Sequence, residues 1–95
     1  MKRPRKYELT LYVAGGDRQS AQAIRAITRL CEESLLGRYT LVIVDIYQQP
    51  ALAREEQIVA APTLIRKLPL PLRRVVGNMA DRDKVLAELD LGPRP

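Results

Sequence analysis

The side chains that could carry out chemistry are few, and they form no catalytic pattern. The single cysteine, Cys31, can neither close an intramolecular disulfide nor complete a Cys-x-x-Cys pair. The lack of histidine removes the commonest general base and the commonest metal ligand. Glu55 and Glu56 are adjacent, and nothing pairs them for acid–base catalysis. We therefore expect a protein that is not an enzyme and that binds neither a metal nor a cofactor.

Two short motifs could bind anions. The loop Gly15-Gly16-Asp17-Arg18 has the glycines of a phosphate loop, but it lacks both a Walker lysine and a dinucleotide fingerprint, so a plain turn is predicted. Arg73 and Arg74 are adjacent, so on a strand their side chains project to opposite faces. One can bind within the protein while the other meets an acidic partner, or both can lie on a solvated edge. Arg66 and Lys67 are predicted to be solvated residues that could join the same basic surface.

Composition limits the class of protein further. A chain of 95 residues, 46% hydrophobic and 28% charged, corresponds to one globular domain. Its net charge of +5 comes largely from a basic, flexible start at residues 1–6, and the lack of Trp and Phe argues against nucleic-acid binding. The longest near-apolar run, 41–46, is interrupted by Asp45 and is too short to span a membrane. With a lone thiol, these features predict a cytoplasmic protein.

The first half of the chain, residues 7–48, is predicted to be a βαβ unit. Apolar side chains alternate from Tyr7 to Val13, as in a strand with one buried face. An amphipathic helix follows the glycine turn, capped by Asp17 or Ser20, and ends near Gly37. Residues 39–46 are apolar on consecutive positions, which is typical of a strand covered on both faces. These elements predict a parallel pair joined by a right-handed crossover.

The second half, residues 49–91, is predicted to be α/β as well, and residues 92–95 form a short tail. Pro50 can begin a helix that runs to about Val59. Strands are expected at 63–68 and 72–76, around a turn built on Pro69 and Pro71. A helix is compatible with 81–91. The resulting order, βαβ followed by αββα, is the thioredoxin-like arrangement.

The hydrophobic pattern of the last segment, residues 85–91, also fits the period of two that is typical of a strand. Val85, Ala87, Leu89 and Leu91 alternate along it, so a half-buried strand is an equal reading of its hydrophobic pattern. Helix propensity favours the helical alternative, but the periodicity does not choose between the two.

Several motifs in order along the chain resemble the KaiB family of circadian clock proteins, from about residue 5 to residue 91. They are LYVAG at 11–15, VDI at 44–46, PALA at 50–53, APTL at 61–64, LPLPLRRVVG at 68–77 and DL at 90–91. The resemblance implies a protein without catalytic activity whose second half takes one of two folds. One is the ground state, βαβ followed by βααβ, assembled as a homotetramer or dimer. The other is the thioredoxin-like monomer.

The resemblance also implies partners. The thioredoxin-like form would bind the ATPase ring of KaiC, displace a sensor histidine kinase with a related domain and, where KaiA exists, capture KaiA. The implied partner-binding residues are Arg73, Arg74, Gln57 and Leu52, and the implied fold-switch residues are Pro62, Gly77, Glu88 and Asp90. For Pro62, the intrinsic preference is trans, whereas thioredoxin-like folds place a cis proline here, so both isomers stay open.

Some residues depart from the family pattern. Glu88 stands where clock members commonly carry Gly, which favours the helical alternative by roughly 0.5 to 1 kcal/mol. Asn78 replaces an Asp, Gln57 replaces a Lys, and the acidic tail of the cyanobacterial members does not follow Leu91. Two functions therefore stay open: a clock or timing protein that acts on a KaiC-type ATPase, or a permanently thioredoxin-like adaptor in stress adaptation without KaiA. For the free, concentrated protein we expect the tetrameric ground state.

Overall fold

The first half of the chain folds as a strand, a helix and a parallel strand. The computed structural model describes residues 6–91, so the predicted basic start at 1–5 and the tail at 92–95 lie outside it. Strand β1 (Tyr7–Val13) leads into helix α1 (Arg18–Ser34), which is followed by strand β2 (Tyr39–Asp45). The Asp17 carboxylate accepts a hydrogen bond of 2.7 Å from the Ser20 N–H, so of the two predicted capping residues Asp17 is the one that caps α1.

The second half has the thioredoxin-like order. Helix α2 (Pro50–Glu55) is followed by strands β3 (Thr63–Leu68) and β4 (Arg73–Val76) and by helix α3 (Arg82–Glu88). The α/β fold class and the αββα alternative are therefore confirmed. Of the two readings of the last segment, this structure contains the helix.

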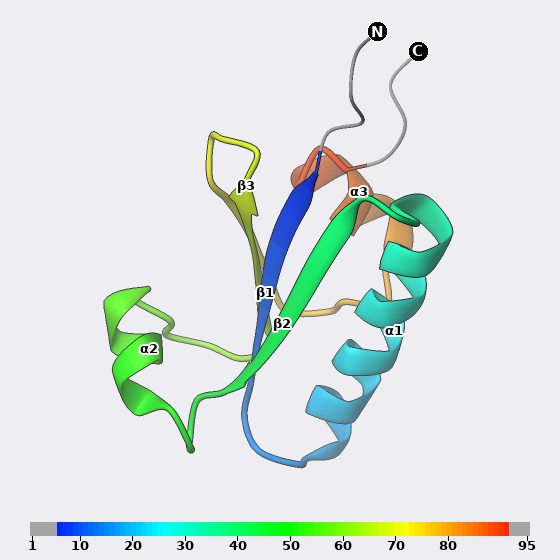
Figure 1. Cartoon of the computed structure of the whole chain (residues 1–95). Helices are drawn as coiled ribbons and strands as arrows, with labels where there is room; N and C mark the ends of the chain where they lie inside the picture. Colours follow the sequence, from blue (N-terminus) through cyan, green and yellow to red (C-terminus); the bar gives the residue numbers. More distant parts are fainter. Residues whose placement is uncertain (1–5, 92–95) are drawn as a thin grey trace, which may run out of the picture.

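The four strands form one sheet in the order β2-β1-β3-β4. Strand β1 pairs parallel to β2 and antiparallel to β3, and β4 pairs antiparallel to β3. Helices α1 and α3 lie on one face of the sheet and α2 on the other (Figure 1). None of the helices within residues 6–91 is both long and apolar enough to cross a membrane.

Each face of the sheet has its own hydrophobic core. The larger core joins alternate residues of β1, such as Leu9 and Leu11, to the inner stripe of α1 and to Val85 of α3. The smaller core, under α2, consists of Tyr12, Val44 and Ile65, with Ile46 and Ile58 packed against it. Alternation along the strands thus divides their side chains between two separate cores.

Strand β2 differs from its predicted environment. We expected both of its faces to be covered, but it is an edge strand, and Val42 and Ile43 are 49% and 40% exposed. Only Val44 of this strand is fully buried. The prediction was wrong because consecutive apolar residues do not tell whether a strand lies at the centre or the edge of a sheet.

The ends of three elements also differ from their predictions. Helix α2 ends at Glu55 rather than near Val59, which is 96% exposed, because Gln57 turns the chain into the left-handed region at φ 55°. Helix α3 spans Arg82–Glu88 rather than 81–91, since Asp90 has φ 53°. Strand β4 begins at Arg73, one residue later than expected.

Candidate partner-binding site

The lone thiol and the glycine loop have structural rather than chemical roles. Cys31 is fully buried on α1, and burial, helped by the nearby Glu32 carboxylate, raises the pKa of its thiol to about 12. Such a thiol stays protonated and is a poor nucleophile at neutral pH. In the glycine loop, the Gly15 N–H donates a hydrogen bond of 3.1 Å to the Asp45 carboxylate. The loop is the plain turn that the sequence predicts.

A polar surface forms where the end of α2 meets β3 and β4. The Arg74 guanidinium donates a hydrogen bond of 3.1 Å to the carbonyl of Glu56, and the Glu56 carboxylate lies 3.2 Å from the Lys67 ammonium. Burial alone would lower the pKa of Lys67, but hydrogen bonds to Glu56 and Tyr12 outweigh it and the pKa is raised. These contacts fix two cationic side chains beside the exposed end of α2.

Two further residues of the predicted partner site belong to the same surface. Leu52 is 37% exposed on α2, and its carbonyl accepts a hydrogen bond of 3.1 Å from the Glu56 N–H. Gln57 follows directly and is exposed. We call Leu52, Glu56, Gln57, Lys67 and Arg74 the α2 surface.

Arg73 is not part of the α2 surface. In the β3–β4 ladder, Arg74 lies opposite Ile65, which belongs to the core under α2, whereas Arg73 lies opposite Arg66. The two adjacent arginines therefore project to opposite faces of the sheet, as expected from strand geometry. The structure brings three of the four predicted partner-binding residues together and places Arg73 on the face that carries α1 and α3.

The four predicted fold-switch residues lie in two places. Pro62 is buried at the start of β3, its bond to Ala61 is cis, and its carbonyl accepts a hydrogen bond of 3.1 Å from the Gly77 N–H. Gly77, at φ 105°, adopts a conformation that side-chain-bearing residues rarely take. Glu88 is exposed in the last turn of α3, and Asp90 follows that helix. One pair thus sits where β3 begins and β4 ends, and the other where α3 ends.

Arg66 is a residue whose role we mispredicted. It was expected to be solvated, but it is only 2% exposed. Its guanidinium donates hydrogen bonds of 2.8 Å to the Leu89 carbonyl and 2.7 Å to the Pro71 carbonyl. Because Arg66 lies two residues after Leu64 on β3, it faces α3, and this period of two was the signal available in the sequence. Arg66 therefore joins β3 and the β3–β4 turn to the carboxyl end of α3.

The fold defines a class: a thioredoxin-like domain, here with its single cysteine buried. Solved structures that share this fold include the following two. The N-terminal domain of Synechococcus elongatus SasA matches with a TM-score of 0.74 and 17% identity, covering 94% of this chain and 84% of that one. Mitochondrial thioredoxin 3 from Saccharomyces cerevisiae matches with a TM-score of 0.72 and 16% identity, covering 90% and 78%.

Sequence comparison identifies the family within that class. The KaiB domain model matches residues 10–91, and the chain belongs to the KaiB family. It is 46% identical over 89 residues to the circadian clock oscillator protein KaiB of Synechococcus elongatus, which covers 93% of this chain and 87% of the relative. It is also 46% identical over 85 residues to the circadian clock protein KaiB3 of a Synechocystis species, covering 90% and 83%.

Proposed function

We propose that this protein is a KaiB-type clock or timing protein that binds a KaiC-type ATPase ring and modulates its phosphorylation cycle or output. Membership of the KaiB family supports the clock role, since the cyanobacterial relatives carry circadian clock names. The α2 surface is the observation that carries the ring-binding proposal. It combines an exposed apolar residue of α2, Leu52, with Lys67 and Arg74, which both contact Glu56, four residues after Leu52. Such a surface suits an apolar partner patch with acidic neighbours.

The α2 surface depends on the fold of the second half. Arg74 reaches the Glu56 carbonyl because β4 pairs with β3 as a hairpin next to α2. In the alternative order, strand–helix–helix–strand, that hairpin does not exist and the surface is not assembled. A partner that binds the α2 surface therefore binds one fold better than the other, which is the condition for selecting a fold.

Switching further requires that the two folds differ by only a few kcal/mol. Residues 85–91 support this proposal because their hydrophobic pattern satisfies both a helix and a strand. In the thioredoxin-like fold, the contacts of Arg66 with Leu89 and Pro71 stabilise the helical alternative. In the ground state, we propose, assembly into a homotetramer or dimer stabilises the strand alternative.

The test is binding to the cognate KaiC-type ATPase, measured by gel filtration and by titration after long incubation in several nucleotide states. We expect a complex that Arg74→Ala weakens about tenfold, since a hydrogen-bonded charge at an interface contributes about 1 to 2 kcal/mol. Lys84→Ala is the matched control, because Lys84 is an exposed cation on α3, on the other side of the sheet. Absence of a complex in all nucleotide states contradicts the proposal.

A second candidate function is a permanently thioredoxin-like adaptor, which the helix-forming Glu88 favours. The N-terminal domain of SasA has the same thioredoxin-like fold as this chain. In either function the protein would work in the cytoplasm, and a sensor histidine kinase with a related domain, or KaiA where it exists, would be the further partner. The adaptor predicts a monomer at high concentration and a single set of amide resonances. A stable tetramer rejects it.

A further inference from the structure

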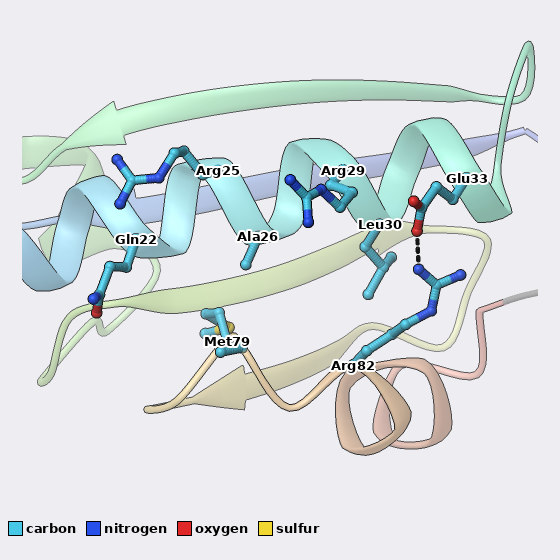
Figure 2. A pocket seen from close by; sticks show the side chains of 9 residues that line it. Gln22, Arg25, Ala26, Arg29, Leu30, Glu33, Met79 and Arg82 are labelled. Atoms are coloured by element: carbon cyan, nitrogen blue, oxygen red, sulfur yellow. Dashed lines mark hydrogen bonds and ion pairs between the residues drawn. The ribbon is translucent and has the colours of Figure 1, made fainter.

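A groove of about 570 Å³ lies between α1 and the segment that leads from β4 into α3. It is on the sheet face opposite α2, so it is separate from the α2 surface (Figures 1 and 2). Ala26, Leu30 and Met79 form its apolar floor, and Arg25, Arg29 and Arg82 surround them. A smaller hollow of about 340 Å³, bounded by Pro62 and Gly77, shares Met79 with the groove and extends it towards the start of β3.

The three arginines of the groove are not equivalent. Arg82 forms an ion pair with Glu33 and donates a hydrogen bond of 3.0 Å to the Ser34 hydroxyl, which joins the start of α3 to the end of α1 (Figure 2). Arg25 and Arg29 are exposed, and neither forms a hydrogen bond or an ion pair with any residue between 6 and 91. The groove thus has one end where Arg82 is paired with Glu33, and two arginines, Arg25 and Arg29, that form no ion pair within residues 6–91.

We propose that this groove binds an acidic peptide segment of a second protein partner, with carboxylates on Arg25 and Arg29 and an apolar side chain on Met79. The two arginines are one helical turn apart, with Cβ atoms about 6 Å from each other. Side chains two residues apart in an extended peptide are separated by about 6.6 Å, so neighbouring carboxylates on one side of such a peptide match the pair. A methionine floor adapts to apolar side chains of different shape.

The chemistry of the groove favours a peptide over other occupants. Its lining contains no aromatic side chain that could stack on a nucleotide base. Residues 1–5 and 92–95 contain no Asp or Glu, so their side chains do not offer the carboxylates that would match the arginines of the groove. Because the groove and the α2 surface lie on opposite faces of the sheet, a ring-bound molecule can present the groove to the second partner.

The test uses the peptide ELELE-amide with fluorescein on its N-terminal amine, and QLQLQ-amide labelled in the same way as the control without carboxylates, in fluorescence anisotropy titrations of the full chain. We expect the acidic peptide to bind and its affinity to fall about tenfold in the double variant Arg25→Ala, Arg29→Ala. The variant Arg25→Lys, Arg29→Lys should recover most of the affinity. Alanine is the best helix former, so the exposed substitutions leave α1 intact.

The matched control is the double variant Arg18→Ala, Lys84→Ala, which removes the same net charge from exposed positions outside the groove. Its affinity for the peptide should be unchanged. Equal weakening in this control, equal binding of QLQLQ-amide, or no binding at millimolar protein overturns the proposal. Binding of inorganic pyrophosphate as tight as that of the acidic peptide also overturns it, since this would indicate a site for small anions. Loss of self-association in the double alanine variant overturns it too, since this would indicate that a second copy of the chain occupies the groove. Binding to the ATPase ring is measured separately. A negative result for the groove together with a complex with the ring therefore contradicts the groove proposal alone.

Discussion

Substitution of Arg66 by Met tests whether this side chain stabilises the thioredoxin-like fold of the second half. Arg66→Met fills the buried position with an unbranched apolar side chain. It removes the guanidinium that donates the hydrogen bonds to the carbonyls of Leu89 and Pro71. Hydrogen bonds from a charged group contribute about 1.5 to 3 kcal/mol each, and removal of a buried charge offsets part of the loss. We therefore expect the free energy of unfolding to fall by about 3 kcal/mol.

The Leu89 carbonyl lies at the end of α3 in this structure. In the proposed ground state residues 85–91 form a strand instead, so the loss is expected to be specific to the thioredoxin-like fold. A change of about 3 kcal/mol corresponds to roughly a hundredfold change in population. Urea denaturation gives the free energy of unfolding, and chemical-shift secondary structure for residues 82–88 reports whether α3 persists. Arg66→Lys should be intermediate, because a lysine ammonium lacks the planar fork that reaches two carbonyls.

Arg73→Met is the matched control for this experiment. Arg73 lies opposite Arg66 in the β3–β4 ladder, is exposed, and donates no hydrogen bond to α3. Its removal should change the free energy of unfolding by less than about 0.5 kcal/mol. If Arg66→Met is as stable as the unchanged protein and retains α3, or if Arg73→Met is equally destabilising, the assigned role of Arg66 is wrong.

Two further perturbations test other parts of the account. Glu88→Gly should weaken α3 by about 0.5 to 1 kcal/mol and raise the ratio of strand to helix signals in NMR spectra a few-fold. The control, Glu32→Gly in α1, should lower the free energy of unfolding without changing the ratio of strand to helix signals. Equal ratios in the two variants would contradict the switch. Asp17→Asn should lower the melting temperature most at neutral pH, because the Ser20 N–H lowers the pKa of the folded carboxyl below its ordinary value of 3.8. The contribution of the charge is present above pH 3.8 and is lost as the pH falls through the folded pKa, so a difference that grows on acidification would refute this assignment.

The elements that the sequence predicts best are those whose pattern is local. Strand β1 has a regular apolar alternation, and α1 combines a capping Asp17 with an apolar stripe, so the observed bounds agree with the predicted ones to within about three residues. The expectation that only one face of β1 is buried was wrong, because β1 lies between β2 and β3 and Thr10 and Tyr12 on its other face are buried too. The fold class follows from the order of such elements. Of the site, strand geometry predicts that Arg73 and Arg74 project to opposite faces.

What the sequence does not specify depends on tertiary contacts. Whether β2 lies at the edge is decided by the position of β3 in the sheet, which no local pattern of 39–46 encodes. The burial of Arg66 depends on carbonyls of Leu89 and Pro71, which come from other parts of the chain. The last segment fits two periods, so packing rather than propensity selects its structure. The groove likewise combines α1 with the segment around Met79, far apart in sequence.

The central claim is that residues 50–91 exchange between two architectures and that a KaiC-type ATPase ring selects the one described here. The most direct measurement is chemical-shift secondary structure for these residues in the free protein over a concentration series, and again after addition of the ring. The account predicts two sets of signals, with strand signals at 85–91 that grow with concentration and helix signals at 82–88 that replace them when the ring is bound. One unchanged helical set at every concentration, with and without the ring, would contradict it.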